Sequence, residues 1–257
     1  MRLEAENRGG NETVQATKAE QVRTWFEETK RYLPRRRYEI AIRAETVRKF
    51  VADKKMHSIL DIGCGDGSIS VPLLSEDNGL TLIDLSSGML EQARARVPLH
   101  LLRNVHILNE DFMRATLQPQ SFDLILCIGV LAHVSSPDEF IARMVQLLKP
   151  GGRIIIEVTD AAHCISLLVW SLLRLWGYFR PTGYNLNRVA VTGIIEAFCR
   201  HQMVLVANFR YLSALPGQDR LFSQAALYKM VRILFGYPES NRNRWLGNEC
   251  IYAFAAP

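Results

Sequence analysis

Between residues 58 and 158, short apolar runs alternate with amphipathic stretches, and this alternation constrains the fold more than any other feature of the chain. Each run has the length and apolar content of a strand buried in a sheet. The runs are 58–62, 80–85, 105–108, 122–128 and 153–158. Strands that alternate with helices form a parallel sheet with right-handed crossovers and helices on both faces. The sequence therefore predicts an α/β fold of the doubly wound kind.

The stretches between these runs, and beyond them, predict the rest of the fold. Residues 87–96 and 137–148 have the spacing of amphipathic helices. Residues 68–75 predict a short helix, despite Pro72 in its first turns. After position 158 we expect helices at 191–200 and 221–235, and strands at 203–209 and 249–255. An antiparallel pair of these last strands would complete a mainly parallel sheet of seven strands.

The length of 257 residues suits one large α/β domain. The first 18 residues contain little that a core could bury. They predict a flexible tail over residues 1–18, followed by a single domain over residues 19–257.

The net charge of +5 would suit an anionic partner, but the positive charge is not gathered in one long block. The densest cluster, residues 35–37, is followed by Arg43 and Arg48 among acidic and apolar residues. A solvated helix face is typical of such a cluster. A phosphate-bearing substrate or a nucleic acid is the alternative.

Five cysteines stand at positions 64, 127, 164, 199 and 250, and none forms a CxxC pair. The odd number and the wide spacing argue against a disulfide framework or a zinc site. No signal peptide precedes a small-residue cleavage site, so a reducing, cytoplasmic location fits best. The most apolar run, residues 164–179, contains Arg174 and falls short of a membrane span.

Ligands of a doubly wound sheet bind beyond the carboxyl ends of its strands, so the loops there predict the ligand. The first loop, residues 63–67, reads Gly-Cys-Gly-Asp-Gly, which lets the backbone turn sharply and approach a ligand too closely for a Cβ. Its amides and the following helix N-terminus can hold a carboxylate. Asp61, just before the turn, can attract a cationic amino group. A carboxylate site beside an ammonium site suits an amino-acid moiety.

The next three loops suit an adenosine. Asp84, at the end of the second run, can accept hydrogen bonds from both ribose hydroxyls. Asp111 can accept from an exocyclic adenine amine, and Phe112 offers an aromatic edge to the ring. The loop after the fourth run brings the backbone of residues 127–129 and His133 to the pocket floor. Together the loops predict a site for an adenosine linked to an amino acid.

In order and spacing, these residues resemble the class I S-adenosylmethionine (SAM)-dependent methyltransferases. The similarity is greatest to the broad small-molecule group that includes ubiquinone-pathway and natural-product enzymes. It rests on residues 60–67, Asp84 with Ser86 and Met89, residues 111–112, 122–134 and 147–152. It covers roughly residues 40–160, and the C-terminal part matches only in outline.

The resemblance implies a Rossmann-like methyltransferase fold with a helical lid and an insertion, and SAM as the cofactor. The implied reaction is methyl transfer to a small organic acceptor, with oxygen, nitrogen and carbon all open as the methylated atom. The cofactor-binding residues, from the loops and the resemblance together, are Asp61, Gly63, Cys64, Gly65, Asp84, Leu85, Met89, Asp111, Phe112, Cys127, Ile128 and Gly129.

His133 is the candidate catalytic residue, because the family often has histidine at this place and imidazole can take a proton near neutral pH. A pocket-lining or loop-bracing histidine is the alternative, since methyl transfer from a sulfonium gains much from proximity and desolvation alone. The N-terminal segment commonly folds over SAM in this family. Residues 19–50 are therefore expected to supply lid helices, with Tyr32 and Tyr38 as candidate lid residues.

Residues 161–190 form the expected insertion, at the place where the family builds acceptor specificity. The run 167–176, with Trp170 and Trp176, is bulkier than a helix covering a sheet requires. It can be core, the wall of an apolar acceptor pocket, or an element that transiently contacts a membrane surface. The pocket wall is our preferred hypothesis, so we expect an acceptor with apolar or aromatic surface.

Other functions compete with this one. A methyltransferase acting on nucleic acid or protein is the alternative, but residues 127–130 lack the Asn/Asp-Pro-Pro-aromatic motif that holds a flipped base. A non-catalytic SAM-binding partner subunit is disfavoured by the intact acids at 61, 84 and 111. A nicotinamide enzyme would have GxGxxG rather than GxGxG. No cluster of ligand-spaced residues predicts a metal, and the oligomeric state is open.

Overall fold

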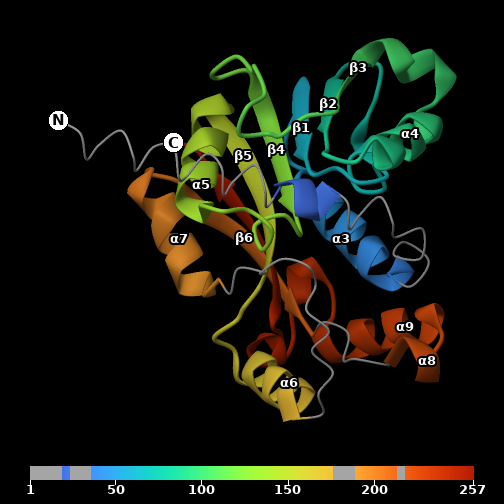
Figure 1. The fold of residues 1–257 in the computed structure, drawn as a ribbon, viewed down its shortest axis with the longest axis vertical. Coiled ribbons are helices and arrows are strands. Elements are labelled where there is room, and N and C mark those ends of the chain that lie inside the picture. The colour runs from blue at the N-terminus through green and yellow to red at the C-terminus, as the bar shows by residue number, and fades with distance from the viewer. Residues whose placement is uncertain (1–18, 24–35, 176–188, 213–217) are drawn as a thin grey trace.

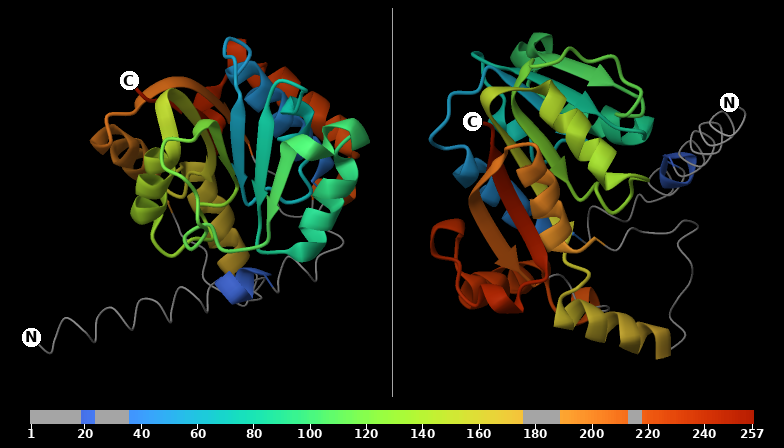
Figure 2. Two further views of the ribbon diagram at one scale, coloured as in Figure 1. Left: turned by 90° about the horizontal axis from the view of Figure 1, so that it is seen from above. Right: turned by 90° about the vertical axis from the view of Figure 1, so that its left-hand side faces the viewer.

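The computed structural model describes residues 19–23, 36–175, 189–212 and 218–257, which form a central sheet with helices on both faces (Figures 1 and 2). In the described ranges the strand order is β3-β2-β1-β4-β5-β7-β6. The strands are β1 Ser58–Ile62, β2 Gly79–Ile83, β3 Val105–Leu108, β4 Phe122–Ile128, β5 Leu148–Thr159, β6 Val204–Tyr211 and β7 Glu249–Ala255.

Strands β1 to β5 run parallel, and β7 pairs antiparallel with both β5 and β6. The predicted doubly wound sheet is confirmed, as is the antiparallel pair that completes it. The chain fills one edge of the sheet from β1 to β3 and then returns to place β4 on the other side of β1. Strand order therefore reverses between β1 and β4, where folds of this kind open a crevice for ligands.

Alternate residues of each central strand face opposite helical layers, as the pleat of a strand requires. Leu60 and Ile125 pack with α5 and α7, whereas Ile59 and Leu124 pack with α3, α4 and α9. The helices are α3 Arg37–Phe50, α4 Ser87–Arg96, α5 Pro137–Leu147, α6 Cys164–Leu175, α7 Val191–Arg200, α8 Gln218–Leu221 and α9 Gln224–Phe235, and short 3₁₀ turns lie at Val71–Leu73, Leu99–Asn104, Pro238–Ser240 and Arg244–Leu246.

Two predicted helices differ from the structure. The segment 68–75 forms only the 3₁₀ turn Val71–Leu73, because Pro72 lacks the amide for an α-helical ladder and Asn78 closes the loop instead. The Asn78 side chain accepts from the Ser75 amide and donates to the Leu73 carbonyl, each at 2.9 Å. The helix predicted over 221–235 begins later, at Gln224 of α9, because Ser223 caps it by accepting from the Ala226 amide, and Leu221 ends the separate helix α8.

Several predicted boundaries also move. β5 begins at Leu148, directly after α5, rather than at Arg153, because Leu148 already pairs with Phe122 of β4. β2 ends at Ile83, so Asp84 belongs to the loop. The predicted tail, residues 24–35 of the predicted lid and residues 176–188 of the insertion lie outside the described residues.

Candidate functional site

A cavity of about 240 Å³ lies at the carboxyl ends of β1, β2, β3 and β4, where the strand order reverses. The loops after these strands supply most of its lining, and α3 and residues 19–23 supply the rest. Of the thirteen predicted site residues, those that line the cavity are Gly63, Cys64, Gly65, Asp84, Leu85, Met89, Asp111, Phe112, Ile128, Gly129 and His133. Asp61 and Cys127 lie just behind the lining and are buried.

The glycine turn after β1 adopts a conformation that other residues rarely take. Gly63 and Gly65 have φ angles of 64° and 54°, in the left-handed region. A Cβ at Gly63 would approach Val130 Cγ2 to 2.4 Å, so a side chain does not fit there. Apart from its chain neighbours, nothing described lies within 4 Å of a Cβ at Gly65, so this backbone is open to a ligand. The predicted carboxylate site on these amides is wrong, because the Gly63 amide donates to the Ile83 carbonyl and the Gly65 amide donates to Asp84 Oδ2, each at 2.8 Å.

The Asp84 carboxylate is held by the loops on either side of it. Its Oδ2 accepts from the Gly65 amide at 2.8 Å, and its Oδ1 accepts from the Ser86 amide at 2.9 Å. Burial raises the pKa of Asp84 above its usual value, and these two amides oppose the increase. The carboxylate is thus fixed in orientation with lone pairs still available to a ligand.

Asp61, at the end of β1, is a buried acid of another kind. It is 3% exposed, and burial together with the charge of Asp84 raises its pKa to about 7. Within the described ranges no ion pair joins Asp61 to a lysine or arginine, whereas its neighbour Asp66 pairs with Arg96. A cationic group beside Asp61 would restore its normal ionisation.

The third acid, Asp111, follows β3 and turns the chain by accepting from the Met113 amide at 2.9 Å. Phe112 is buried beside it, with its ring 4.7 Å from that of Phe140. Met89, in the first turn of α4, is also buried and lines the cavity. These apolar side chains give this end of the cavity two surfaces suited to a flat ring.

The loop after β4 forms the cavity floor. His133 is half-buried, lines the cavity, and donates its amide to the Val130 carbonyl at 2.8 Å. Burial raises the pKa of both the Cys64 and Cys127 thiols, so neither is an activated thiolate.

Helix α3 lies in the segment expected to supply lid helices, but its residues at the cavity were not predicted as site residues. Ile40 and Arg43 line the cavity, and Arg43 Nε donates to Glu157 Oε1 at 2.7 Å. The solvated helix face that the basic cluster favours is wrong for Arg43, since its side chain is 13% exposed. The available signal was Glu157, which interrupts the otherwise apolar run of β5.

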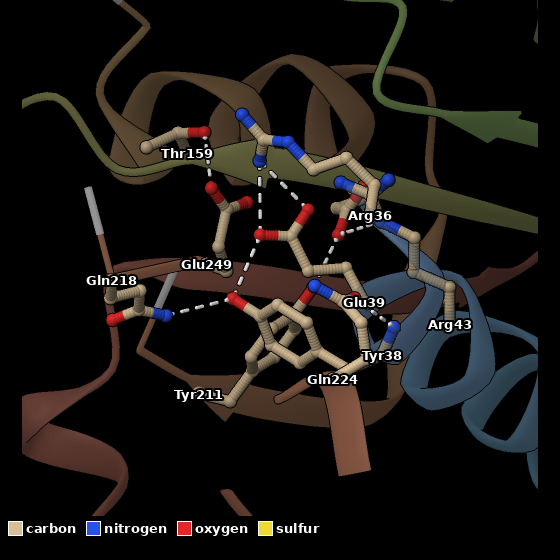
Figure 3. A network of polar contacts seen from close by, with 10 residues as sticks. Arg36, Tyr38, Glu39, Arg43, Thr159, Tyr211, Gln218, Gln224 and Glu249 are labelled. Atoms are coloured by element: carbon tan, nitrogen blue, oxygen red, sulfur yellow. Dashed lines mark hydrogen bonds and ion pairs between the residues drawn. The ribbon is translucent and has the colours of Figure 1, made fainter. Parts of the chain in front are cut away.

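Behind this wall lies a network of buried polar side chains (Figure 3). Tyr38 donates to Glu39 at 3.0 Å and accepts from Gln218 at 3.1 Å. It is buried and outside the cavity lining, so the structure places this candidate lid residue in the network. Glu249 accepts from Thr159 at 2.7 Å, and burial with the charge of Glu157 raises its pKa to about 8.

The described residues of α6 lie outside the cavity lining, and the helix projects from the edge of the molecule (Figure 2). Leu167 and Leu168 on it are 54% and 59% exposed. Among the helices of the described ranges, none has the length and hydropathy to cross a bilayer. In the same ranges, no three histidine, cysteine or carboxylate side chains are grouped to hold a metal.

Residues 59–152 match the family model of a methyltransferase domain. A ubiquinone biosynthesis O-methyltransferase from Saccharophagus degradans is 36% identical over 116 residues, which are 43% of this chain and 45% of that protein. One from Rickettsia akari is 30% identical over 125 residues, which are 46% and 47% of the two proteins. The chain thus spans about half the length of the curated relatives it matches.

Solved structures resemble nearly the whole chain. A SAM-dependent methyltransferase from Thermotoga maritima has a TM-score of 0.66 at 15% identity, covering 93% of this chain and all of that one. A magnesium protoporphyrin IX methyltransferase from Synechocystis, with bound S-adenosylhomocysteine (SAH), has a TM-score of 0.62 at 16% identity over the same shares. At such identities the likeness concerns the fold.

The fold, the matched domain and the glycine turn together define the class of protein. Residues 59–152 carry a methyltransferase domain on the fold of the class I SAM-dependent methyltransferases, and SAM is the cofactor of that class. The predicted family and fold are confirmed.

Proposed function

We propose that the whole protein transfers a methyl group from SAM to a small organic acceptor with apolar or aromatic surface. The observation that carries this proposal is the grouping of three acids, Asp61, Asp84 and Asp111, around one glycine-lined cavity. The names of the curated relatives, which are O-methyltransferases of ubiquinone biosynthesis, support a small organic acceptor.

The residues fit an adenosyl amino acid. The open backbone at Gly65 would lie against its amino-acid part, and Asp61 would face its ammonium group, which explains a buried acid without an ion pair in the described part of the chain. Asp84 would accept from the ribose hydroxyls. Asp111 would accept from the adenine amine, with Met89 and Phe112 against the ring.

When bound, SAM supplies an electrophilic methyl group on its sulfonium. The chain's own part is to hold the acceptor in line with that group and to exclude water, and both effects lower the barrier. His133 lines the cavity and is the candidate base for an acceptor proton. In the alternative role, His133 takes no proton and only shapes the wall of the cavity.

Titration calorimetry tests the cofactor half of the proposal. SAM and SAH should both bind at a single site, and a nicotinamide dinucleotide should not compete with them. Turnover is then followed as SAH formed from SAM with a panel of phenols, alcohols and amines. Binding of a dinucleotide in place of SAM would contradict the proposal. SAM binding without turnover of any acceptor would favour a non-catalytic SAM-binding subunit instead.

A further inference from the structure

A second cavity, of about 120 Å³, lies at the opposite end of the sheet from the cofactor cavity. Its walls come from the loop 51–56 after α3, from residues 123–124 of β4 and from residues 150–153 of β5. Residues 123–124 lie at the start of β4, whereas the cofactor cavity is lined by residues that follow this strand. No described residue lines both cavities, so a ligand in the second one would not compete with the cofactor.

The charges at this second cavity leave two lysines without a carboxylate. Asp123, the one acid of the described lining, already pairs with Lys149 at 3.1 Å. Lys54 and Lys55 also line the cavity and are exposed. Lys54 Nζ donates to the neutral Gly151 carbonyl at 3.2 Å, and no ion pair within the described ranges involves either lysine. The cavity therefore carries two positive charges that an anionic ligand would balance.

Arg153, in the same lining, is 9% exposed and has hydrogen-bond donors to spare. Its planar guanidinium carries five N–H groups. Nη1 donates to the Phe50 carbonyl and also to Asp53 Oδ1, the latter at 2.9 Å, and Nη2 donates to Asp53 Oδ2 at 3.2 Å. Nε has no hydrogen-bond partner among the described residues, so Nε–H and one Nη2–H remain, side by side on one edge of the group. Because a buried donor normally has a partner, this edge is suited to an oxyanion that accepts two parallel hydrogen bonds.

Charge and size together indicate the class of ligand. Two ammonium groups without a carboxylate partner favour an anion with two charges, and the free guanidinium edge favours a group with paired oxygens. A phosphoryl group has both properties, whereas a carboxylate has a single charge. The cavity is smaller than the roughly 300–1,000 Å³ of sites for drug-sized ligands, so it would hold a phosphate but not a nucleotide.

We propose that the second cavity binds a phosphoryl group, which the free edge of Arg153 and the ammonium groups of Lys54 and Lys55 hold. The inference goes beyond the proposed function, because this ligand takes no part in methyl transfer. The two lysines belong to the loop after α3 and Arg153 belongs to β5, so the bound group would join these elements and stabilise the folded state. Free phosphate and a small phosphate monoester share this chemistry.

The test titrates inorganic phosphate, glycerol 3-phosphate and acetate into the ¹⁵N-labelled protein at constant ionic strength, with binding followed by NMR. We expect phosphate or its ester to bind with a dissociation constant below about 1 mM, and at least about tenfold tighter than acetate. The Nε–H resonance of Arg153 should move during the same titration, because this proton enters a new hydrogen bond. Whichever phosphate binds more tightly indicates whether the site takes free phosphate or a monoester.

A double variant, Lys54→Gln with Lys55→Gln, removes both charges that lack a carboxylate and changes only exposed side chains. Its affinity for phosphate should fall by about tenfold or more, because the remaining guanidinium is already paired with Asp53. Lys229→Gln is the matched control: it removes an exposed lysine of α9 that lines neither cavity, and it should keep the wild-type affinity.

The proposal is overturned if neither phosphate binds more tightly than acetate, if the Arg153 Nε–H resonance stays in place when phosphate is added, or if the double variant keeps the wild-type affinity. The thermal midpoint reports whether each variant folds. Should the double variant not fold, the Arg153 resonance of the wild-type protein decides alone. A protein that binds phosphate here but ignores SAH would contradict only the proposed function.

Discussion

The cofactor side of the cavity is built from short loops that follow neighbouring strands, whereas the wall around Glu157 is built from residues far apart in the chain. Gly65 and Asp84 bond each other across 19 positions, and both lie at ends of paired strands. Arg43 and Glu157 are 114 positions apart, and Tyr211 joins them from a third element. The first side is therefore a property of local motifs, and the second is a property of the assembled fold.

The largest effect on the cofactor side is expected from the substitution Gly63→Ala. Its methyl group would meet Val130 Cγ2 at 2.4 Å, and its φ of 64° disfavours any side chain. We expect a loss of about 2–4 kcal/mol in the free energy of unfolding, measured in urea. Gly65→Ala is the control, because it has a similar φ but no described neighbour within 4 Å, and it should cost about 1 kcal/mol. Equal losses would contradict the clash.

Asp84→Ala changes only the cofactor side of the cavity, so it tests whether the two sides act separately. It should weaken SAM binding by about 1–3 kcal/mol in calorimetry, because charge-assisted hydrogen bonds to the ribose are lost. Glu157→Gln is the counterpart on the other side and should leave SAM affinity unchanged. If both variants weakened SAM equally, the division of the cavity into two sides would be wrong.

The pH dependence of SAM binding sharpens the assignment of Asp61. Its raised pKa, about 7, means that the free protein holds a proton there at acidic pH. An ammonium group binds the ionised form, so SAM affinity should fall as pH drops below about 7, by roughly tenfold per pH unit. Asp61→Asn should bind more weakly with a flatter profile. A wild-type profile that is flat between pH 5 and 7 would count against Asp61 as the ammonium partner.

A smaller effect is expected from Glu249→Gln on stability. The pKa of about 8 in the folded state exceeds the usual value of 4.5 for this carboxyl, so the folded state keeps a proton that the unfolded state releases between these values. Stability therefore declines as pH rises through this window, by less than about 1.4 kcal/mol per pH unit. The variant should show a shallower decline in thermal midpoint. An unchanged slope would show that Glu249 ionises normally.

The same contrast explains what could be predicted from the sequence. The bounds of β1, β3, β4 and β7 agree with the predicted runs, because buried strands between turn residues carry a strong apolar pattern. The site loops follow these strands directly, so their residues could be placed as well. The helix at 68–75 failed because a single proline and an asparagine side chain outweigh a weak pattern.

The second side could not be predicted from one stretch of chain. Arg43 and Arg48 look alike in the sequence, yet the Arg43 side chain is largely covered and pairs with Glu157, while Arg48 is exposed. Only the packing of α3 on the face of the sheet that carries Glu157 distinguishes them. The roles of Trp170 and Trp176 as an acceptor wall stay a prediction.

The central claim is that three strand-end acids and a glycine turn hold an adenosyl amino acid, and a crystal structure with SAH tests it most directly. We expect the amino-acid part of the ligand against the glycine turn of residues 63–65, the ribose hydroxyls on Asp84, and the adenine beside Met89 and Phe112. An adenosyl group bound outside this cavity, or a ribose that does not touch Asp84, would contradict the account.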